Sequence, residues 1–116
     1  MKIVFDQVEE AVLSRFQGGE GALIARIQND GLNKILHGTL HPGSTVGLHT
    51  HVTNSEIIYI ISGQGKVLYD GAYETVAAGD CHYCPKGHSH SLINDSDGDL
   101  VFFAAVPEHG NADVPA

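Results

Sequence analysis

The sequence predicts an all-β protein, built as a closed or two-sheet antiparallel barrel. Fourteen glycines and four prolines occur in 116 residues, so turns are frequent. The apolar residues fall into runs of about four to eight between those turns, a length typical of strands. No stretch shows a persuasive helical pattern, and roughly ten short strands account for most of the chain.

Length and composition limit the function classes. We expect one domain, with a core over residues 22–107, an N-terminal arm or strand over 1–21 and a tail over 108–116. Six basic against fourteen acidic residues give a net charge of −8, which argues against nucleic acid and anionic membranes as partners. The N-terminus has no apolar run long enough for a signal peptide or a membrane span. We therefore expect a cytoplasmic protein with reduced cysteines.

The first third of the chain predicts strands joined by a tight turn. Residues 1–20 are the least regular and favour a short strand or an extended arm. Residues 22–28 and 33–40 are apolar enough for two strands. The intervening Asn29-Asp30-Gly31 is typical of a hairpin turn.

The run from Ile57 to Ile61 is apolar at both its odd-numbered and its even-numbered positions. If Glu56 points inward, Ile58 and Ile60 line the interior, and the residues that face outward are Ile57, Tyr59 and Ile61. An apolar outer face needs a cover, and a chain this short has few elements to provide one. We therefore expect a homodimer that packs sheet on sheet.

The second half predicts one hairpin and two further strands. Residues 65–69 and 73–76 form a hairpin across Asp70-Gly71, a strong signal for a type I′ turn. Cys81 to Cys84 is a short strand that ends at Pro85, which lacks a ladder donor. Residues 100–106 are fully apolar and predict the closing strand.

Two histidines and a glutamate suggest a metal site. His49 and His51 are two residues apart, so on a strand both imidazoles leave the same face. Residues 52–55 are typical of a turn. Glu56 then opens the next strand, which we expect to pair antiparallel and to bring its carboxylate back to the two rings. Two nitrogens and an oxygen would suit a divalent transition metal.

A second stretch, residues 79–94, offers a fourth ligand. A turn at Pro85-Lys86-Gly87 is followed by His88 and His90 at strand spacing. Either histidine could complete the site.

These residues resemble the cupin superfamily, which carries two sequence motifs. The first motif is fitted by Gly43, His49, His51, Glu56 and Gly63. The second is fitted by Gly79, Pro85, Gly87, His90 and Asn94. The resemblance implies a double-stranded β-helix, or jelly-roll barrel, and a homodimer, as in small single-domain cupins. It also implies one divalent ion (Mn, Fe, Ni, Zn or Cu) whose ligands are His49, His51, Glu56 and His90.

The resemblance leaves several functions open. Small cupins that are oxalate-decarboxylase-like suggest a metal-dependent enzyme for a small oxygen-rich molecule, such as a carboxylic acid or a sugar. Dioxygenation, decarboxylation and isomerisation all occur in the superfamily. The alternative is a metal-loaded module that binds or senses a small ligand without turnover. A structural dimer with a vestigial site is a weaker reading, because the ligand set is complete. The sequence predicts no catalytic residue.

Other polar side chains are candidates for the surroundings of the site. Arg26 and Lys34 lie on the strands before the first motif, and either could point inward to hold a carboxylate, although such residues more often face solvent. His88 could be a metal ligand, or a base that hydrogen-bonds to one. His82 could hydrogen-bond near the pocket, but a rim or exposed position is the simpler expectation. Two further histidines, His37 and His41, could approach the mouth, and His109 lies in the tail.

Cys81 and Cys84 form a C-x-x-C pair. On a strand, positions three apart face opposite sides, so the sulfurs would diverge. We therefore expect small buried apolar residues rather than a redox pair or a zinc site.

Overall fold

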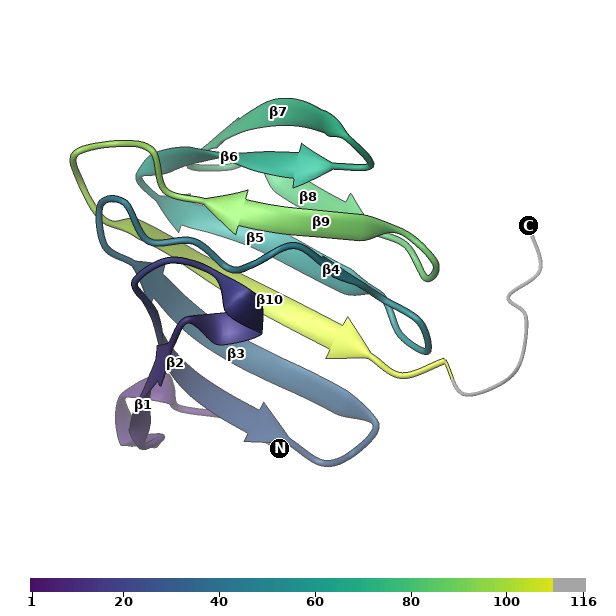
Figure 1. The fold of residues 1–116 in the computed structure, drawn as a ribbon. Coiled ribbons are helices and arrows are strands. Elements are labelled where there is room, and N and C mark those ends of the chain that lie inside the picture. Colours follow the sequence, from purple (N-terminus) through teal and green to yellow (C-terminus); the bar gives the residue numbers. More distant parts are fainter. Residues whose placement is uncertain (110–116) are drawn as a thin grey trace.

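The computed structural model describes residues 1–109 and folds them into two antiparallel sheets that face each other (Figure 1). One sheet has the order β1-β2-β3-β10-β5-β8 and the other the order β4-β9-β6-β7. This confirms the predicted all-β jelly-roll architecture. The strands are β1 (Glu10–Ser14), β2 (Ala22–Asn29), β3 (Asn33–Leu40), β4 (His49–Thr50), β5 (Glu56–Ser62), β6 (Gln64–Tyr69), β7 (Ala72–Ala77), β8 (Cys81–Cys84), β9 (Ser89–Ile93) and β10 (Leu100–Pro107).

Two short 3₁₀ turns, η1 (Phe5–Gln7) and η2 (Phe16–Gly18), are the helical elements among these residues. Neither has the length and hydrophobicity that a membrane-spanning helix requires.

Both predicted hairpins are present. The β2–β3 turn is fixed by Asp30, whose carboxylate accepts hydrogen bonds from the backbone amides of Leu32 and Asn33 at 2.9 and 2.8 Å. The β6–β7 turn has positive φ at both Asp70 (46°) and Gly71 (84°), as a type I′ turn requires.

The core lies between the inward faces of the two sheets. On β5, Ile58 and Ile60 are 2% and 0% exposed, whereas Ile57, Tyr59 and Ile61 are 39–46% exposed, so the predicted alternation is confirmed. The largest fully buried side chains include Phe102, Leu23, Leu40, Ile60, Leu92 and Leu100.

The N-terminal residues include one short strand and a segment that packs against the backbone before β4. β1 pairs antiparallel with β2. The segment that follows approaches the backbone before β4 closely: the amide of Gly47 donates to the carbonyl of Phe16 at 3.0 Å. A Cβ atom at Gly47 would lie 2.0 Å from the carbonyl oxygen of Gln17, so a side chain does not fit there.

The predicted pairing of the His49 strand with the Glu56 strand is wrong. β4 pairs with β9, with His49 opposite His90, whereas β5 lies between β10 and β8 in the other sheet. The loop of residues 51–55 therefore crosses from one sheet to the other. Glu56 reaches the histidines across the barrel interior rather than along a hairpin.

The first two residues of the predicted tail make backbone hydrogen bonds. The amide of Glu108 donates to the carbonyl of Leu32 at 2.7 Å, and the amide of His109 donates to that of Thr53 at 2.8 Å. The rest of that prediction, over residues 110–116, lies outside the described residues.

Candidate metal centre

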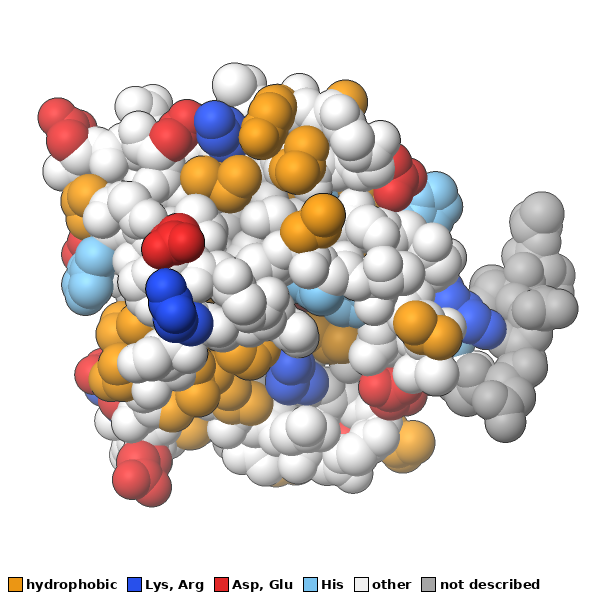
Figure 2. All heavy atoms as spheres, viewed as in Figure 1, with side chains coloured by type: hydrophobic (Ala, Val, Ile, Leu, Met, Phe, Trp, Pro, Cys, Tyr) orange, Lys and Arg blue, Asp and Glu red, His pale blue; other side chains and the backbone are white. Residues whose placement is uncertain are grey.

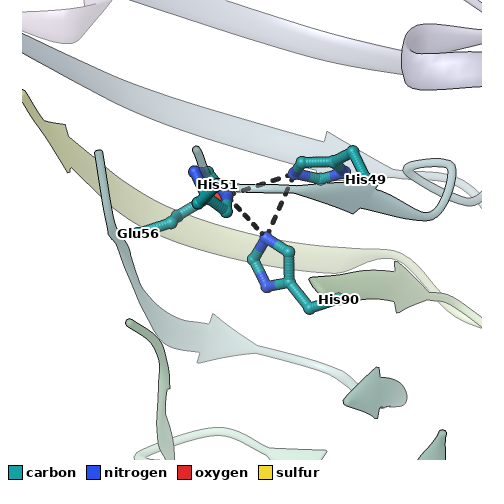
Figure 3. Close-up of side chains that lie close together, drawn as sticks. All are labelled: His49, His51, Glu56 and His90. Carbon is teal, nitrogen blue, oxygen red and sulfur yellow. Dashed lines mark hydrogen bonds and ion pairs between the residues drawn. The ribbon is translucent and has the colours of Figure 1, made fainter. Parts of the chain in front are cut away.

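Four side chains from three strands and a loop converge inside the barrel (Figure 3). His49 lies on β4, His90 on the neighbouring β9, His51 just after β4, and Glu56 at the start of β5 in the opposite sheet. One donor atom from each lies within 4.8 Å of the others. We call these four residues the tetrad. They are the four residues that the sequence predicts as ligands.

The contacts within the tetrad are short. The Nε2 atom of His90 lies 2.9 Å from Nε2 of His51 and 3.1 Å from Nε2 of His49. The Oε1 atom of Glu56 lies 3.0 Å from Nε2 of His90, 3.1 Å from that of His51 and 3.8 Å from that of His49. Little of the tetrad is exposed, with side-chain fractions between 1% for His90 and 15% for His49.

Hydrogen bonds at Nδ1 fix the tautomers of His49 and His51. The Nδ1 atom of His49 faces the carbonyl oxygen of Gly47 at 2.7 Å, and an oxygen of this kind can only accept. The Nδ1 atom of His51 faces Oδ1 of Asn54, whose amide nitrogen donates to the Glu108 carboxylate at 2.9 Å. Both rings therefore donate from Nδ1, so in their neutral forms Nε2 carries a free lone pair.

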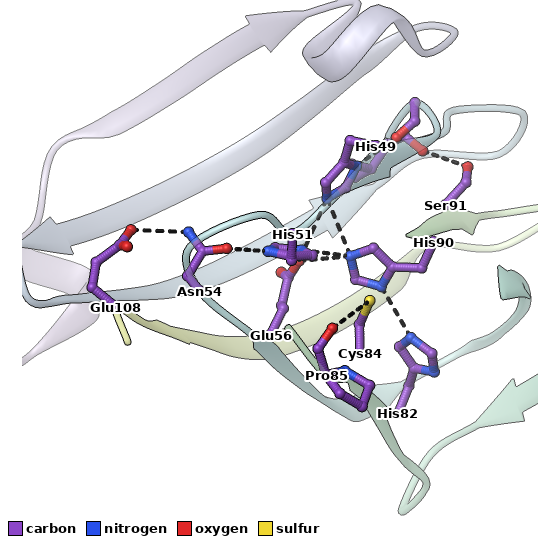
Figure 4. A network of polar contacts seen from close by, with 12 residues as sticks. His49, His51, Asn54, Glu56, His82, Cys84, Pro85, His90, Ser91 and Glu108 are labelled. Carbon is purple, nitrogen blue, oxygen red and sulfur yellow. Dashed lines mark hydrogen bonds and ion pairs between the residues drawn. The ribbon is translucent and has the colours of Figure 1, made fainter. Parts of the chain in front are cut away.

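His90 reaches the same tautomer through a second histidine (Figure 4). Its Nδ1 atom lies 3.0 Å from Nε2 of His82, and Nδ1 of His82 contacts the carboxylate of Glu74. Because a carboxylate only accepts, His82 donates to Glu74 and accepts from His90. His82 is 2% exposed, so the expectation of a rim or exposed position for it is wrong.

The arrangement fits a divalent transition metal. The Nε2 lone pairs of the three imidazoles and the carboxylate of Glu56 point toward one another. No proton remains to bridge them in the neutral rings, and a cation between them would stabilise the arrangement. Metal–ligand bonds of about 2.1 Å at right angles put neighbouring donors about 3.0 Å apart. The observed separations around His90 match this value and suit an octahedral ion with open positions. Nitrogen and oxygen donors of this kind are compatible with Mn, Fe, Ni, Zn or Cu.

Burial and mutual contacts shift the pKa values of Glu56, His90 and His51. Burial favours the neutral form of Glu56, but its contacts with the imidazoles of His49, His51 and His90 outweigh burial and hold its pKa well below the usual value. Burial lowers the pKa of His90. Burial acts in the same direction on His51, yet hydrogen bonds to Glu56 and Asn54 raise its pKa overall, against the charge of Lys34.

A cavity of about 300 Å³ opens beside the tetrad. Figure 2 shows histidine recessed near the middle of one face, with a basic side chain beside it. Half of the residues that line the cavity are apolar, including Phe16, Leu36 and Phe102, and Lys34 also lines it. Among the described lining residues, Lys34 is the only ionisable one outside the tetrad.

The other candidate residues lie apart from the tetrad. Arg26 bonds to the carbonyl of Val8 at 2.6 Å and faces the N-terminal segment. The ring of His37 packs on that of Phe5 at 5.8 Å. The remaining candidates have polar partners elsewhere: Asp99 for His41, Asp70 for His88 and Ser55 for His109.

His88 differs from His90 because it precedes β9 and lies in the turn. The rule that residues two apart on a strand share a face therefore does not apply to His88 and His90.

The cysteines point to opposite sides, as predicted, and both are free. Cys84 is fully buried, and burial raises the pKa of its thiol to about 12. Cys81 is exposed, so the expectation of a buried residue is wrong there.

Sequence reasoning missed the residues that orient the tetrad. Asn54, Glu74 and Glu108 belong to no motif. Asn54 is three residues from its partner His51, whereas Glu108 is 54 residues from its partner Asn54. For His82 a signal existed: it is two residues before Cys84, so both share the inward face of one strand.

Comparison with known proteins identifies the family. A model described as a cupin domain matches residues 36–106, more than half of the chain. The chain belongs to the cupin domain family. It is 42% identical over 67 residues to an oxalate-binding protein of Thermotoga maritima, over 58% of this chain and 55% of that protein. It is 32% identical over 73 residues to an uncharacterized protein of Methanocaldococcus jannaschii, over 62% and 58% of the two chains. The matches thus span less than two thirds of either relative.

Solved cupin structures agree with this fold. A crystal structure described as a predicted oxalate decarboxylase from Thermotoga maritima superposes with a TM-score of 0.87 at 29% identity, over 93% of this chain and 99% of that one. A sugar phosphate isomerase of the cupin superfamily from Silicibacter pomeroyi gives a TM-score of 0.77 at 20% identity, over 93% and 76%. At 20% identity, the similarity to the sugar phosphate isomerase shows a shared fold and no more.

Proposed function

We propose that this cupin holds one divalent metal ion on the tetrad and binds a small carboxylate, of the oxalate class, in the adjoining cavity. The observation that carries the proposal is the position of Lys34 on the wall of the cavity that the tetrad also lines. The likeness to a protein named for oxalate binding supports the same ligand class. The ion, once bound, supplies Lewis-acid attraction for carboxylate oxygens.

The charges of the site favour an anion. Glu56 neutralises one of the two positive charges of a divalent ion, and the ammonium of Lys34 adds one more. The cavity would thus be positive, whereas the whole chain carries −8. A small dianion would match this local charge better than a neutral sugar does.

The cavity volume of about 300 Å³ and the apolar half of its wall favour a small ligand. Leu36, Val46 and Phe102 line the cavity and offer no hydrogen bonds. A ligand with polar groups on all sides, such as a sugar, would leave unpaired those groups that face these three side chains. A short dicarboxylate can direct its oxygens to the tetrad and to Lys34 at once.

Turnover is the second candidate. Three imidazoles and one carboxylate leave coordination positions open on an octahedral ion, and the donor separations suit that geometry. Decarboxylation, dioxygenation and isomerisation are the reaction classes to examine.

Calorimetric titration tests the binding proposal. We expect oxalate to bind the metal-loaded protein more tightly than acetate or glucose, and not to bind chelator-stripped protein. Lys34→Met, which keeps the length and removes the charge, should weaken oxalate binding by about tenfold, which corresponds to about 1.4 kcal/mol for one charged hydrogen bond. Equal affinities for oxalate in the variant and the wild type would refute the role of Lys34. Carbon dioxide release and oxygen uptake in the same samples distinguish turnover from binding.

We further propose that the protein is a homodimer through the outer face of β5 and β8. The ring of Phe5 packs on Phe103 at 6.3 Å, so the N-terminal segment covers the adjacent part of this sheet. The remaining apolar residues are 39–54% exposed and lie together: Ile57, Tyr59, Ile61 and Tyr83. A second copy would remove them from water.

A further inference from the structure

His82 connects a metal-ligand candidate to a carboxylate across both sheets. It lies on β8, the edge strand of the six-stranded sheet, while Glu74 and His90 lie on β7 and β9 of the four-stranded sheet. The His82 side chain is 1% exposed and the Glu74 side chain is 46% exposed. Two hydrogen bonds therefore link a partly exposed carboxylate to the most buried member of the tetrad. Figure 4 shows the one between His82 and His90.

The His82 ring is held in place by its neighbours. It stacks on the His90 ring with centroids 5.2 Å apart and an interplanar angle of 26°. The edge of the Tyr69 ring meets it at 5.5 Å and 77°. With both ring nitrogens bonded and both ring contacts made, the imidazole has one orientation, and His90 is aligned with it.

His90 differs in this respect from the other two imidazoles. His49 donates to a neutral backbone carbonyl, and His51 donates to the neutral amide of Asn54. The partner of His90 is itself an imidazole that donates to an ionised carboxylate. Hydrogen bonds to charged groups are stronger, and consecutive bonds polarise one another. Electron density is thus directed toward Nε2 of His90.

We propose that Glu74 and His82 form a positioning pair that orients His90 and strengthens it as a metal donor, so that metal affinity depends on a carboxylate outside the ligand set. This inference rests on the proposed metal centre. Outer partners of ligating histidines typically change metal affinity by about 10- to 100-fold.

Cobalt(II) is a suitable probe, because its visible absorption reports the strength of its ligands. We would titrate cobalt(II) against a competing chelator in the wild type, Glu74→Gln, His82→Phe and Glu9→Gln. Glu74→Gln keeps an acceptor oxygen and removes the charge. Glu9→Gln is the matched control at an exposed carboxylate outside the tetrad and its hydrogen-bond partners.

We expect cobalt(II) affinity to fall about 10-fold in Glu74→Gln and toward 100-fold in His82→Phe, with no change in Glu9→Gln. The absorption band of the bound ion should shift in Glu74→Gln, whereas the melting temperature of the metal-free variant should stay that of the wild type. This combination separates ligand tuning from a loss of fold.

The outcomes distinguish the two proposals. If the wild type and Glu74→Gln bind cobalt(II) with equal affinity and equal spectra, the positioning role is overturned and the metal centre stands. If the wild type binds no cobalt(II), or His51→Ala binds it as tightly as the wild type does, the metal centre itself is overturned, and the positioning role with it.

Discussion

The hydrogen-bond partner of each imidazole decides which ring nitrogen is available to a metal. In the tetrad, every Nδ1 atom has an acceptor, so every Nε2 atom points inward with its lone pair free in the neutral ring. This common orientation is the residue-scale basis of the proposed centre. It predicts that removing one imidazole, or protonating one, strongly weakens metal binding.

His51→Ala should abolish stable metal binding, because it removes one donor and the partner of Asn54. A metal that binds only the native state, at a hundred times its Kd, stabilises the wild type by about 2.7 kcal/mol. The variant should lack this increment, and its melting temperature should not rise when metal is added. Elemental analysis after purification without chelating resin gives the occupancy, and a variant with wild-type metal content would contradict the assignment.

Metal affinity should fall as the pH is lowered from 7.5 to 5.5. The raised pKa of His51 means that its proton is retained to a higher pH than in a free imidazole, and the metal must displace it. Below its pKa, each imidazole that must lose a proton weakens binding by up to about tenfold per pH unit. Competition titrations in non-coordinating buffers measure the slope. An affinity that does not change over this range would show that no proton is displaced.

At the scale of elements, the site depends on how the backbone before β4 packs. Gly47 supplies the carbonyl that orients His49 and also touches the N-terminal segment at Phe16 and Gln17. Gly47 therefore both orients His49 and packs against the N-terminal segment. A displacement of the N-terminal segment should change both the free energy of unfolding and the affinity for metal.

Gly47→Ala should destabilise the fold by about 1–3 kcal/mol, the usual effect of overpacking, because its Cβ would overlap the carbonyl of Gln17. It should also weaken metal binding, since the Gly47 carbonyl must move. Gly98→Ala is the matched control, because no heavy atom lies within 4 Å of the added Cβ. Urea unfolding of the metal-free proteins measures the first effect. Equal midpoints for the two variants would contradict the close packing.

Much of this could be predicted from the sequence, and the exceptions have a physical cause. The parity of His49 and His51 and the alternation along β5 are local, so spacing alone predicts them. The pairing of β4 is not local: a strand of two residues has no pattern that selects its neighbour. The outer carboxylates share this difficulty. Glu74 accepts from His82 and Glu108 accepts from Asn54, and tertiary folding alone brings both to the site.

At the scale of the whole molecule, the outer face of the six-stranded sheet is only partly covered. Tyr59 lies beside Phe103 in register, but the Phe5 ring that packs on Phe103 belongs to a segment nearer β2 and β3. The apolar surface over β5 therefore stays available for a second copy.

Tyr59→Glu should convert the proposed dimer into a monomer, because it would place a charge in the middle of the buried face. Light scattering at micromolar concentration should give about 25 kDa for the wild type, as expected for two copies, and 12.3 kDa for the variant. Tyr73→Glu, an exposed tyrosine on β7 of the other sheet, should leave the mass unchanged. A 12.3 kDa wild type would exclude the dimer at that concentration.

The tetrad takes three of its members from the strand pair β4–β9 and its loop, and the fourth from β5 in the facing sheet. An ion bound there would act as a removable crosslink between two layers that otherwise meet through apolar side chains and the two hydrogen bonds of His82. Amide hydrogen exchange should then slow on both layers together when the ion is added, and the two layers should open independently once it is withdrawn.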